Sequence, residues 1–273
     1  MRLGNKNGWL AVVAVLVATA TPPALAQSQA QVRPTTAMDD RWHFNLVPYM
    51  WLTGIKGEVS AAGLTEIPVD APFSDIWDNF DFGLAGRFEG RKNRFGFGLD
   101  FTYNNLGVPV ASSAPIVGAL GLEADVRQLF TEGLGFYRVA QGGRSDNPAH
   151  LDLLAGVRYT TTRVRLTAET NAGATYDGQF QELDWLDAMA GFKFRAPLGA
   201  RAAFLGRADV AGFGSNVTWN LEGDLAFVAS PHWTIGAGWR HMDIDYDNDD
   251  EGLGLRQFDL AYDGPRVWFA YSW

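Results

Sequence analysis

Every second residue of the last eight in the chain is apolar or aromatic. This set is Val267, Phe269, Tyr271 and Trp273, and the intervening set includes Arg266, Ala270 and Ser272. In a water-soluble protein such a tail would leave an adhesive sheet edge, open to pairing with any other strand. The pattern is accounted for if the first set faces lipid and the second faces a lumen, because transmembrane β-barrel strands have this two-residue period. The C-terminus therefore predicts a closed antiparallel transmembrane β-barrel.

The N-terminus agrees with export from the cytoplasm. Arg2 and Lys6 form a short positive region. Residues 8–19 form an apolar run of about a dozen residues, too short for a membrane-spanning helix. Residues 24–26, Ala-Leu-Ala, match the small-residue cleavage pattern of a secretory signal peptide. We predict a signal peptide over 1–26, with an uncleaved anchor as the alternative.

Cleavage at this point sets the domain organisation and the charge of the mature chain. We expect a disordered periplasmic leader over 27–41 and an outer-membrane β-barrel domain over 42–273. Losing Arg2 and Lys6 reduces the 22 basic residues to 20, against 31 Asp and Glu residues, a net charge of −11. This argues against a nucleic-acid partner, which requires a basic surface. No cysteine occurs, so the closed barrel rather than disulfides must stabilise the exported protein.

Alternating apolar and polar residues recur in ten stretches. We predict strands at 42–53, 82–91, 95–104, 122–139, 151–162, 185–195, 202–212, 217–228, 233–242 and 258–273. Lys92, Asn93 and Arg94 form a tight turn, so the second and third strands make a hairpin. An even number of strands returns both termini to the periplasm. Eight or twelve strands stay open as alternatives, because 54–71 could hold another hairpin and short strands could merge.

Two of these strands are irregular. The neighbours of Glu132 are mixed in character, so the facing of 122–139 stays open. In the last strand we predict a bulge at Gly264 and Pro265, because proline cannot donate to a β ladder.

The connections alternate between short and long, as this class of barrel requires. We predict short turns at 92–94, 197–200 and 230–232, a longer turn at 141–150, and outer loops at 54–81, 105–121, 166–183 and 245–257. Eight tryptophans mostly lie near strand ends or on lipid-facing positions: Trp42, Trp51, Trp185, Trp219, Trp233, Trp239, Trp268 and Trp273. They predict aromatic girdles at the two membrane interfaces.

A soluble lipocalin-like barrel or sandwich is the alternative fold. It would point its aromatic faces inward and its charges outward, and alternation by itself does not distinguish inside from outside. Three features favour the membrane. The charged faces contain opposite charges that can pair, the aromatic residues crowd strand ends, and the chain ends on an aromatic strand.

Several motifs carry a resemblance to a known family. They are Trp42-x-Phe44-x-Leu46-x-Pro48-Tyr49-Met50-Trp51, Phe73-Ser74-Asp75-Ile76, Gly86-Arg87-Phe88-Glu89, Ala208-Asp209-Val210-Ala211-Gly212-Phe213-Gly214, Gly238-Trp239-Arg240-His241-Met242-Asp243 and Tyr262-x-Gly264-Pro265. The mature chain resembles a family of largely uncharacterised proteobacterial outer-membrane β-barrel proteins, loosely similar to opacity-type and porin-like small barrels. The resemblance implies the fold and the outer-membrane location. The chain departs from the family at His241, where an aromatic residue is expected, and at Ala208, where glycine is expected.

The predicted location implies partners. The barrel would contact outer-membrane lipid and lipopolysaccharide. Its C-terminal strand, which ends in an aromatic residue, resembles the signal that outer-membrane barrels present to the barrel assembly machinery. The lipid-facing strands look alike, so the sequence leaves the oligomeric state open.

The lumen is the first candidate site. The inward positions place charges there: Arg87, Glu89, Arg91, Asp100, Arg158, Asp187, Lys193, Arg195, Arg207, Asp209, Glu222, Asp224, Arg240 and Arg266. The interior of a barrel of eight to ten strands is filled or nearly filled by side chains, and buried charges must be paired. We expect an ion-pair network that plugs the barrel. The alternative is a narrow polar pore with a charge-lined constriction, for which the balanced signs give no ion selectivity.

The second candidate is the acidic run 243–251. Its spacing of Asp243, Asp245 and Asp247 resembles the first half of a calcium loop, but the glycine and distant glutamate are out of register. A solvated loop is the expectation. Weak Ca²⁺ or Mg²⁺ binding, shared with lipopolysaccharide phosphates, is the alternative.

Two further candidates are weaker. His241 lies near Asp243, but no serine stands two residues after it, and its position is lipid-facing, so we expect an interfacial residue rather than catalysis. Ser74 could cap a short helix over 74–80 that rests on the rim or acts as a gate. We predict no catalytic residue, cofactor or metal site.

The expected function is therefore that of an outer-membrane barrel with a structural or narrow porin-like role, passing small polar solutes slowly. The alternative is a surface protein whose acidic and aromatic outer loops bind lipopolysaccharide, a divalent cation or a host factor. A lipid-modifying enzyme is disfavoured.

Overall fold

Stretches of alternating character form long β-strands in the computed structural model. It describes residues 40–61, 67–72, 80–110, 119–144, 147–170, 175–177, 181–247 and 255–273, all within the unit Gln31–Trp273. In this part of the chain, no helix has the length and apolar character needed to cross a membrane. The predicted signal peptide and nearly all of the predicted leader lie outside the described residues.

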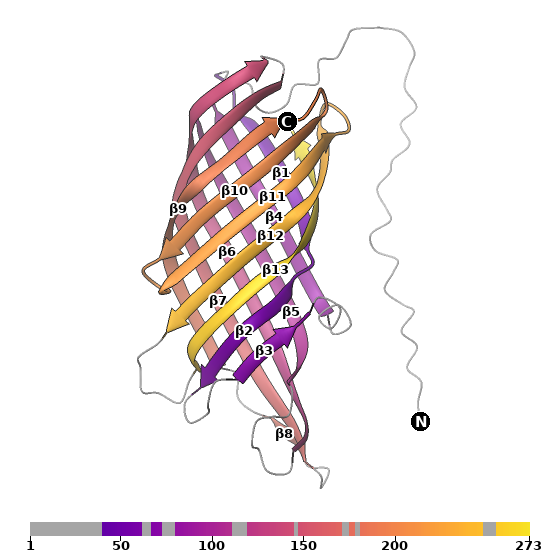
Figure 1. Cartoon of the computed structure of the whole chain (residues 1–273), viewed down its shortest axis with the longest axis vertical. Helices are drawn as coiled ribbons and strands as arrows, with labels where there is room; N and C mark the ends of the chain where they lie inside the picture. Colours follow the sequence, from indigo (N-terminus) through magenta and orange to yellow (C-terminus); the bar gives the residue numbers. More distant parts are fainter. Residues whose placement is uncertain are drawn as a thin grey trace. The chain divides into compact units, whose positions relative to one another are not determined.

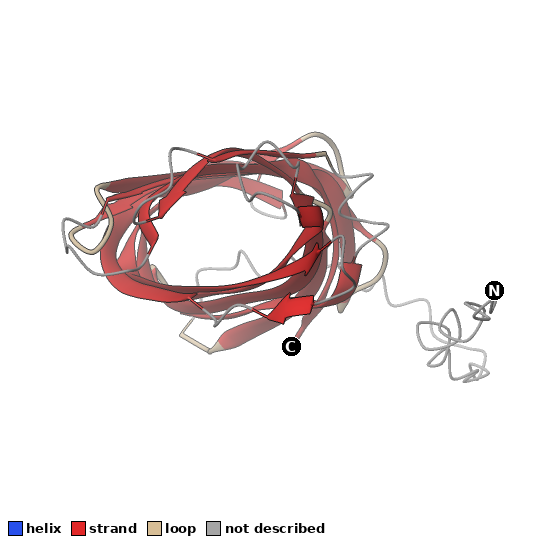
Figure 2. Ribbon diagram, turned by 90° about the horizontal axis from the view of Figure 1, so that it is seen from below, coloured by secondary structure: helices blue, strands red, loops and turns tan. Residues whose placement is uncertain are grey.

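Ten long strands close into an antiparallel ring (Figure 2). They are β1 (His43–Trp51), β4 (Phe80–Lys92), β5 (Phe95–Val110), β6 (Ala119–Arg144), β7 (Asn147–Thr170), β9 (Gln181–Pro197), β10 (Ala202–Gly212), β11 (Val217–Val228), β12 (Trp233–Asp247) and β13 (Leu255–Ser272). They pair in this order, and β1 returns to β13 through pairs such as Asn45 with Ser272. The protein is an all-β, closed ten-stranded antiparallel barrel, which confirms the predicted fold class.

Shorter strands lengthen the wall. β2 (Gly54–Ala61) and β3 (Ile67–Ala71) form the additional hairpin that the sequence allowed at 54–71. β2 continues β1 along β13 in the same register, since Trp51 pairs with Arg266 and Gly54 pairs with Asp263. β8 (Thr175–Asp177) pairs with the end of β7.

The break between β1 and β2 lies opposite Pro265. The Leu52 N–H donates to the Pro265 carbonyl at 2.9 Å, but proline has no N–H to return the bond. At Gly264 the strands are so close that an added Cβ would stand 2.1 Å from the Leu52 carbonyl oxygen. On its other side, β13 pairs with β12 without a register shift. The bulge predicted at this point is therefore wrong: the proline interrupts the neighbouring strand without inserting a residue.

The two ends of the barrel differ (Figure 1). We call the end with the turns at 93–94, 198–201 and 229–232 and the C-terminus the turn end, and the other the loop end. Much of the predicted loops 105–121 and 166–183 and of the predicted turn 141–150 is strand instead. β6 has 26 residues and β7 has 24, because polar β-formers such as those in 160–170 continue the pairing beyond the apolar pattern.

Most apolar side chains point outward, and most charged side chains of the barrel wall point inward. Outward Leu153, Leu221 and Val267 are 52%, 52% and 48% exposed, whereas inward Asp152 and Arg158 are fully buried. This is the reverse of a soluble barrel. It confirms the facing predicted for 151–162, 217–228 and 258–273.

β6 carries apolar residues on both faces, which is why its sequence left the facing open. Tyr137 and Val139 point outward and are exposed, while Phe130, Phe136 and Glu132 point inward and are buried. The β6 face that bears Glu132 therefore belongs to the lumen.

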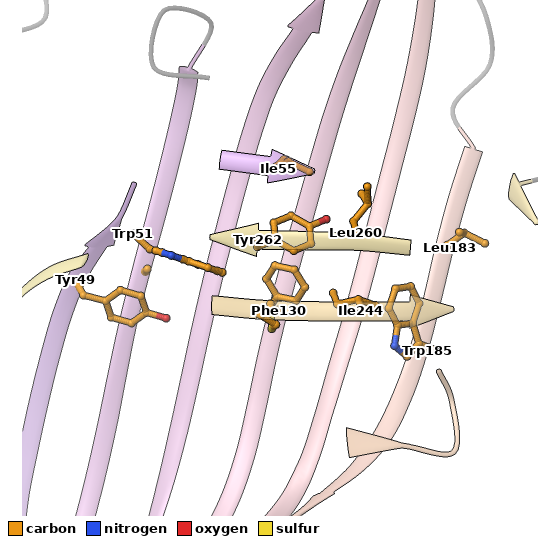
Figure 3. Close-up of a cluster of buried hydrophobic side chains, with 11 residues drawn as sticks. Tyr49, Trp51, Ile55, Phe130, Leu183, Trp185, Ile244, Leu260 and Tyr262 are labelled. Atoms are coloured by element: carbon orange, nitrogen blue, oxygen red, sulfur yellow. The ribbon is translucent and has the colours of Figure 1, made fainter. Parts of the chain in front are cut away.

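Towards the loop end, the lumen is filled by a cluster of apolar side chains (Figure 3), which we call the loop-end cluster. It includes Tyr49, Trp51, Ile55, Phe130, Leu183, Trp185, Met242, Ile244, Leu260 and Tyr262. Trp268 packs against it. The girdle prediction is wrong for Trp51, Trp185 and Trp268, because they occupy inward positions. The other five tryptophans are exposed, between 41% and 50%.

Candidate functional site

Four charged side chains from β6, β7 and β10 form a buried square in the lumen. Arg158 donates to Glu132 Oε1 at 2.9 Å through Nε, and to Asp209 Oδ1 at 2.6 Å through Nη2. Arg207 Nη2 donates to Glu132 Oε2 at 2.6 Å, and its Nε lies 2.8 Å from Asp209 Oδ2. Each carboxylate is thus shared by both guanidinium groups. Charge-assisted bonds of this kind are about twice as strong as neutral ones.

Glu222 anchors a second group of ion pairs. Its Oε1 lies 3.0 Å from Arg87 Nη2, and its Oε2 lies 2.8 Å from Arg266 Nη1. Arg87 Nε also reaches Asp100 Oδ2 at 2.5 Å, and Arg266 pairs with Asp224. The result is a row of alternating charges across the lumen, from Asp100 on β5 to Asp224 on β11.

Arg240 joins the two groups to the loop-end cluster. Its guanidinium nitrogens lie 3.8 Å from Glu132 Oε1 and 3.7 Å from Glu222 Oε1. Its Nε donates to Asn220 Oδ1 at 2.8 Å, and its guanidinium stands 4.5 Å from the centre of the Trp51 ring, a cation–π distance. We call the whole set the central network: Arg87, Asp100, Glu132, Arg158, Arg207, Asp209, Glu222, Asp224, Arg240 and Arg266.

Asp187, which the sequence placed among the lumen charges, has a different role. It is fully buried, but its Oδ1 accepts the backbone N–H groups of Gly214 and Ser215 at 2.9 and 2.7 Å. Its Oδ2 accepts the Ser215 hydroxyl at 2.9 Å and Trp185 Nε1 at 3.1 Å. The carboxylate therefore holds the turn between β10 and β11 against β9.

A separate charged group lies nearer the turn end. Asp152 pairs with Arg91 and accepts Arg138 Nε at 2.9 Å. Lys193 Nζ lies 2.7 Å from Glu89 Oε1. The ammonium of Lys193 also stands 3.6 Å from the centre of the Phe136 ring. Glu89, predicted with the lumen charges, thus belongs to this turn-end group and not to the central network.

A cavity of about 240 Å³ occupies the turn-end half of the lumen. It reaches from Ser230, Pro231 and Ser272 at the turn end to Arg207 and Glu222 of the central network. Its walls carry eight basic side chains, Arg87, Arg91, Arg138, Lys193, Arg195, Arg201, Arg207 and Arg266, and four acidic ones, Glu89, Asp152, Glu222 and Asp224. The cavity is therefore basic, although the chain as a whole is acidic.

Sequence reasoning missed Glu132 and this cavity. Glu132 bonds two arginines, yet the facing of its strand could not be assigned. The register places Glu132 beside Arg158 on β7 and Asp100 on β5. Both neighbours were predicted to face the lumen, so pairing β6 with these strands could have predicted that Glu132 faces inward as well.

The other candidates lie at the loop end or outside the described residues. His241 Nδ1 and Trp239 Nε1 both lie 2.9 Å from Asp263 Oδ1 on the outer face of the barrel, and the His241 ring stands 4.5 Å from that of Trp219. Among the described residues, no group of three or more acidic or histidine side chains could hold a metal ion. The segment 74–80 lies outside them apart from residue 80, as does 248–251 of the acidic run.

No family model and no curated protein sequence matches the chain. Similar solved structures include the outer membrane protease OmpT from Escherichia coli, at 9% identity and TM-score 0.45, over 88% of this chain and 99% of that one. The translocator domain of the autotransporter NalP from Neisseria meningitidis has 14% identity and TM-score 0.40, over 84% and 88%. OprG from Pseudomonas aeruginosa has 14% identity and TM-score 0.34, over 86% and 97%. Similarity this low assigns no activity to the chain.

Proposed function

We propose that the protein is an outer-membrane barrel that spans the bilayer with its ten strands and is closed to solutes by its central network. The observation that carries this proposal is the facing of the side chains. A belt of half-exposed apolar residues covers the outside, and arginines and carboxylates are fully buried inside. This arrangement is favourable when the barrel is surrounded by lipid, because the apolar belt then contacts hydrocarbon. In water the belt would stay exposed to solvent, and the charged side chains would be buried although they could have been hydrated on the surface.

The aromatic residues support a particular position in the bilayer. Around the turn end, the centre of the Phe44 ring lies 5.9 Å from that of Trp42 and 5.7 Å from that of Trp273. The ring centres of Trp233 and Tyr271 lie 5.0 Å apart. Aromatic belts mark membrane interfaces. Short turns face the periplasm in bacterial outer-membrane barrels, so we place the turn end in the periplasm and the loop end at the cell surface, beside lipopolysaccharide.

The central network supports a structural role over continuous passage. Glu132, Arg158, Asp209 and Arg240 are 6% exposed or less, so no water-filled path separates them. The loop-end cluster adds a second, apolar obstruction between this network and the cell surface. Slow passage of small polar solutes remains the second candidate, because the cavity already extends from the turn end to Arg207 and Glu222.

Conductance in a planar bilayer tests the proposal. The refolded chain is first checked by the electrophoretic shift between boiled and unboiled samples. We expect no discrete current steps from the wild type. We expect steps when Glu132→Ala and Arg158→Ala, which remove one side of the buried square, are combined with Trp51→Ala, which opens the loop-end cluster. The matched control is Glu182→Ala with Arg163→Ala, an exposed pair, and it should stay silent. Steps from the wild type would favour slow passage and refute the closed lumen.

A surface-binding role at the loop end is the alternative. The acidic side chains Asp245, Asp247 and Asp259 lie on neighbouring strands there and could share divalent cations with lipopolysaccharide phosphates. This alternative would be supported if the non-conducting wild-type barrel bound lipopolysaccharide in a calcium-dependent way. Deletion of 247–252 should then abolish the binding.

A further inference from the structure

We propose that the turn-end cavity binds a small organic anion: a carboxylate or phosphate head group on an apolar body. This goes beyond the proposed closed barrel and does not depend on whether the barrel conducts. The starting observation is the charge of the cavity wall outside the central network. There the described residues place five cationic side chains against two carboxylates, Glu89 and Asp152. Buried charge requires compensation by an opposite charge, and the described residues supply only part of it on this wall.

The need for a further anion is clearest at Arg91. Among the described residues its carboxylate partner is Asp152, which also accepts Arg138 Nε and lies 3.9 Å from His150 Nε2. The Arg91 side chain is only 8% exposed. Among the described residues, Arg91 Nη1 and His150 Nδ1 are buried and have no hydrogen-bond partner. A buried donor without an acceptor is costly, and an anionic oxygen beside Arg91 would satisfy it.

Two more arginines line the cavity nearer the mouth. Arg195 is held by Asn147 Oδ1 at 2.6 Å and by the Pro148 carbonyl at 2.9 Å, which fixes its guanidinium group without neutralising it. Arg201 is exposed. Within the described part of the chain, neither forms an ion pair with a carboxylate. Unneutralised cations at the entrance of a cavity attract anions and raise their local concentration.

The remaining wall of the cavity is apolar, so it favours an anion that also carries an apolar group. Ala203, Leu205, Ala226, Val228 and Ala270 line it from β10, β11 and β13, on the other side of the ring from β6 and β7. The volume of about 240 Å³ exceeds the roughly 150 Å³ cavity that holds a benzene molecule. An aromatic ring or a short alkyl chain therefore fits against this wall while its head group faces the arginines.

A matched pair of probes separates charge from shape. The chain is refolded in a non-ionic detergent, and 4-fluorobenzoate and 4-fluorobenzamide are titrated by ¹⁹F NMR. We expect saturable binding of the benzoate, and binding of the neutral amide at least about tenfold weaker, since a bond between charged groups accounts for that much. Added salt should weaken the benzoate complex. Inorganic phosphate, which has no apolar body, should compete poorly.

Variants locate the site. Arg91→Gln should weaken benzoate binding about tenfold or more, and Arg201→Gln, an exposed and structurally undemanding change, should weaken it several-fold through the lost attraction. The control Arg163→Gln removes the same charge outside the cavity and should have no effect. Equal binding of benzoate and benzamide, no binding of either, or equal affinity in the two cavity variants and the control would overturn the proposal. Phosphate that binds as tightly as benzoate would overturn the apolar part of it.

Discussion

Glu132→Gln tests whether the central network lies in a dry interior. The side chain is 1% exposed and bonds Arg158 at 2.9 Å and Arg207 at 2.6 Å, with Arg240 at 3.8 Å. The amide keeps one oxygen for Arg158, but it turns an NH₂ group towards Arg207, where two donors would then meet. Breaking a buried ion pair by removing one partner costs about 3 to 5 kcal/mol. We expect the free energy of unfolding to fall by about that much.

Glu182→Gln is the matched control. Glu182 accepts Arg163 Nη2 at the same distance, 2.6 Å, but the two side chains are 47% and 51% exposed. Exposed ion pairs contribute about 1 kcal/mol or less. The same chemical change at the same bond length should therefore give a loss several times smaller.

Urea unfolding in lipid vesicles, followed by tryptophan fluorescence and by the gel shift of the folded barrel, measures both variants. Unchanged slopes would allow the midpoints to be read as stability differences. Equal small losses in Glu132→Gln and Glu182→Gln would refute the reasoning, because they would mean that water screens the interior as it screens the surface. A hydrated interior would also weaken the proposal of a closed lumen.

Three smaller perturbations test other features of the barrel. Phe213→Gly should stabilise it by about 1 kcal/mol in the same urea assay, because Phe213 is 98% exposed and has a φ of 88° that disfavours any residue with a Cβ. Asp187→Ala should cost about 2 to 3 kcal/mol, since it leaves two backbone N–H groups and a hydroxyl of the β10–β11 turn without their acceptor; an unchanged midpoint would contradict this. Gly238→Ala should prevent refolding, as judged by the gel shift, because the new Cβ would stand 2.1 Å from the Gly223 carbonyl oxygen; the control Gly133→Ala meets nothing nearer than 3.9 Å and should fold.

The strand number and most facings followed from the sequence where the two faces of a strand differ in chemistry. Leu221 and Glu222 are an example: one faces outward at 52% exposure and the other inward at 3%. Residues alternate in this way because one face of the strand contacts lipid and the other faces a charged interior. Where both faces of a strand are apolar, alternation does not predict which face points inward.

The difference between the two faces disappears at the loop end and along β6. Phe130 and Trp185 are as apolar as any lipid-facing residue, yet they are 1% and 5% exposed inside the lumen. Their positions follow from packing against residues far along the chain, such as Tyr262, whose ring lies 5.7 Å from that of Phe130. Contacts between residues far apart in the chain produce no pattern in the local sequence. For this reason the girdle prediction included three tryptophans that lie inside the barrel.

The cavity was beyond the sequence for a related reason. Arg91, Arg138, Arg195 and Arg201 each lie at or next to the end of a strand predicted from the sequence, close to a predicted turn. Taken singly, each is an ordinary charged residue near a turn. The barrel register brings them together, because Arg138 lies opposite Asp152 and His150 lies opposite Arg195. A search for cations at strand ends on one side of a predicted barrel would have found the cluster.

The relative positions of the network and the cavity limit what the barrel does with a ligand. Arg207 and Glu222 belong to both, so the floor of the cavity is the wall of ion pairs. In the closed barrel that we propose, a molecule in the cavity enters and leaves by the turn end, on the periplasmic side. Such a site exchanges with one compartment and holds its ligand there. If the turn end faces the periplasm, as we propose, this geometry allows an anion to exchange with the periplasm but not to cross the outer membrane.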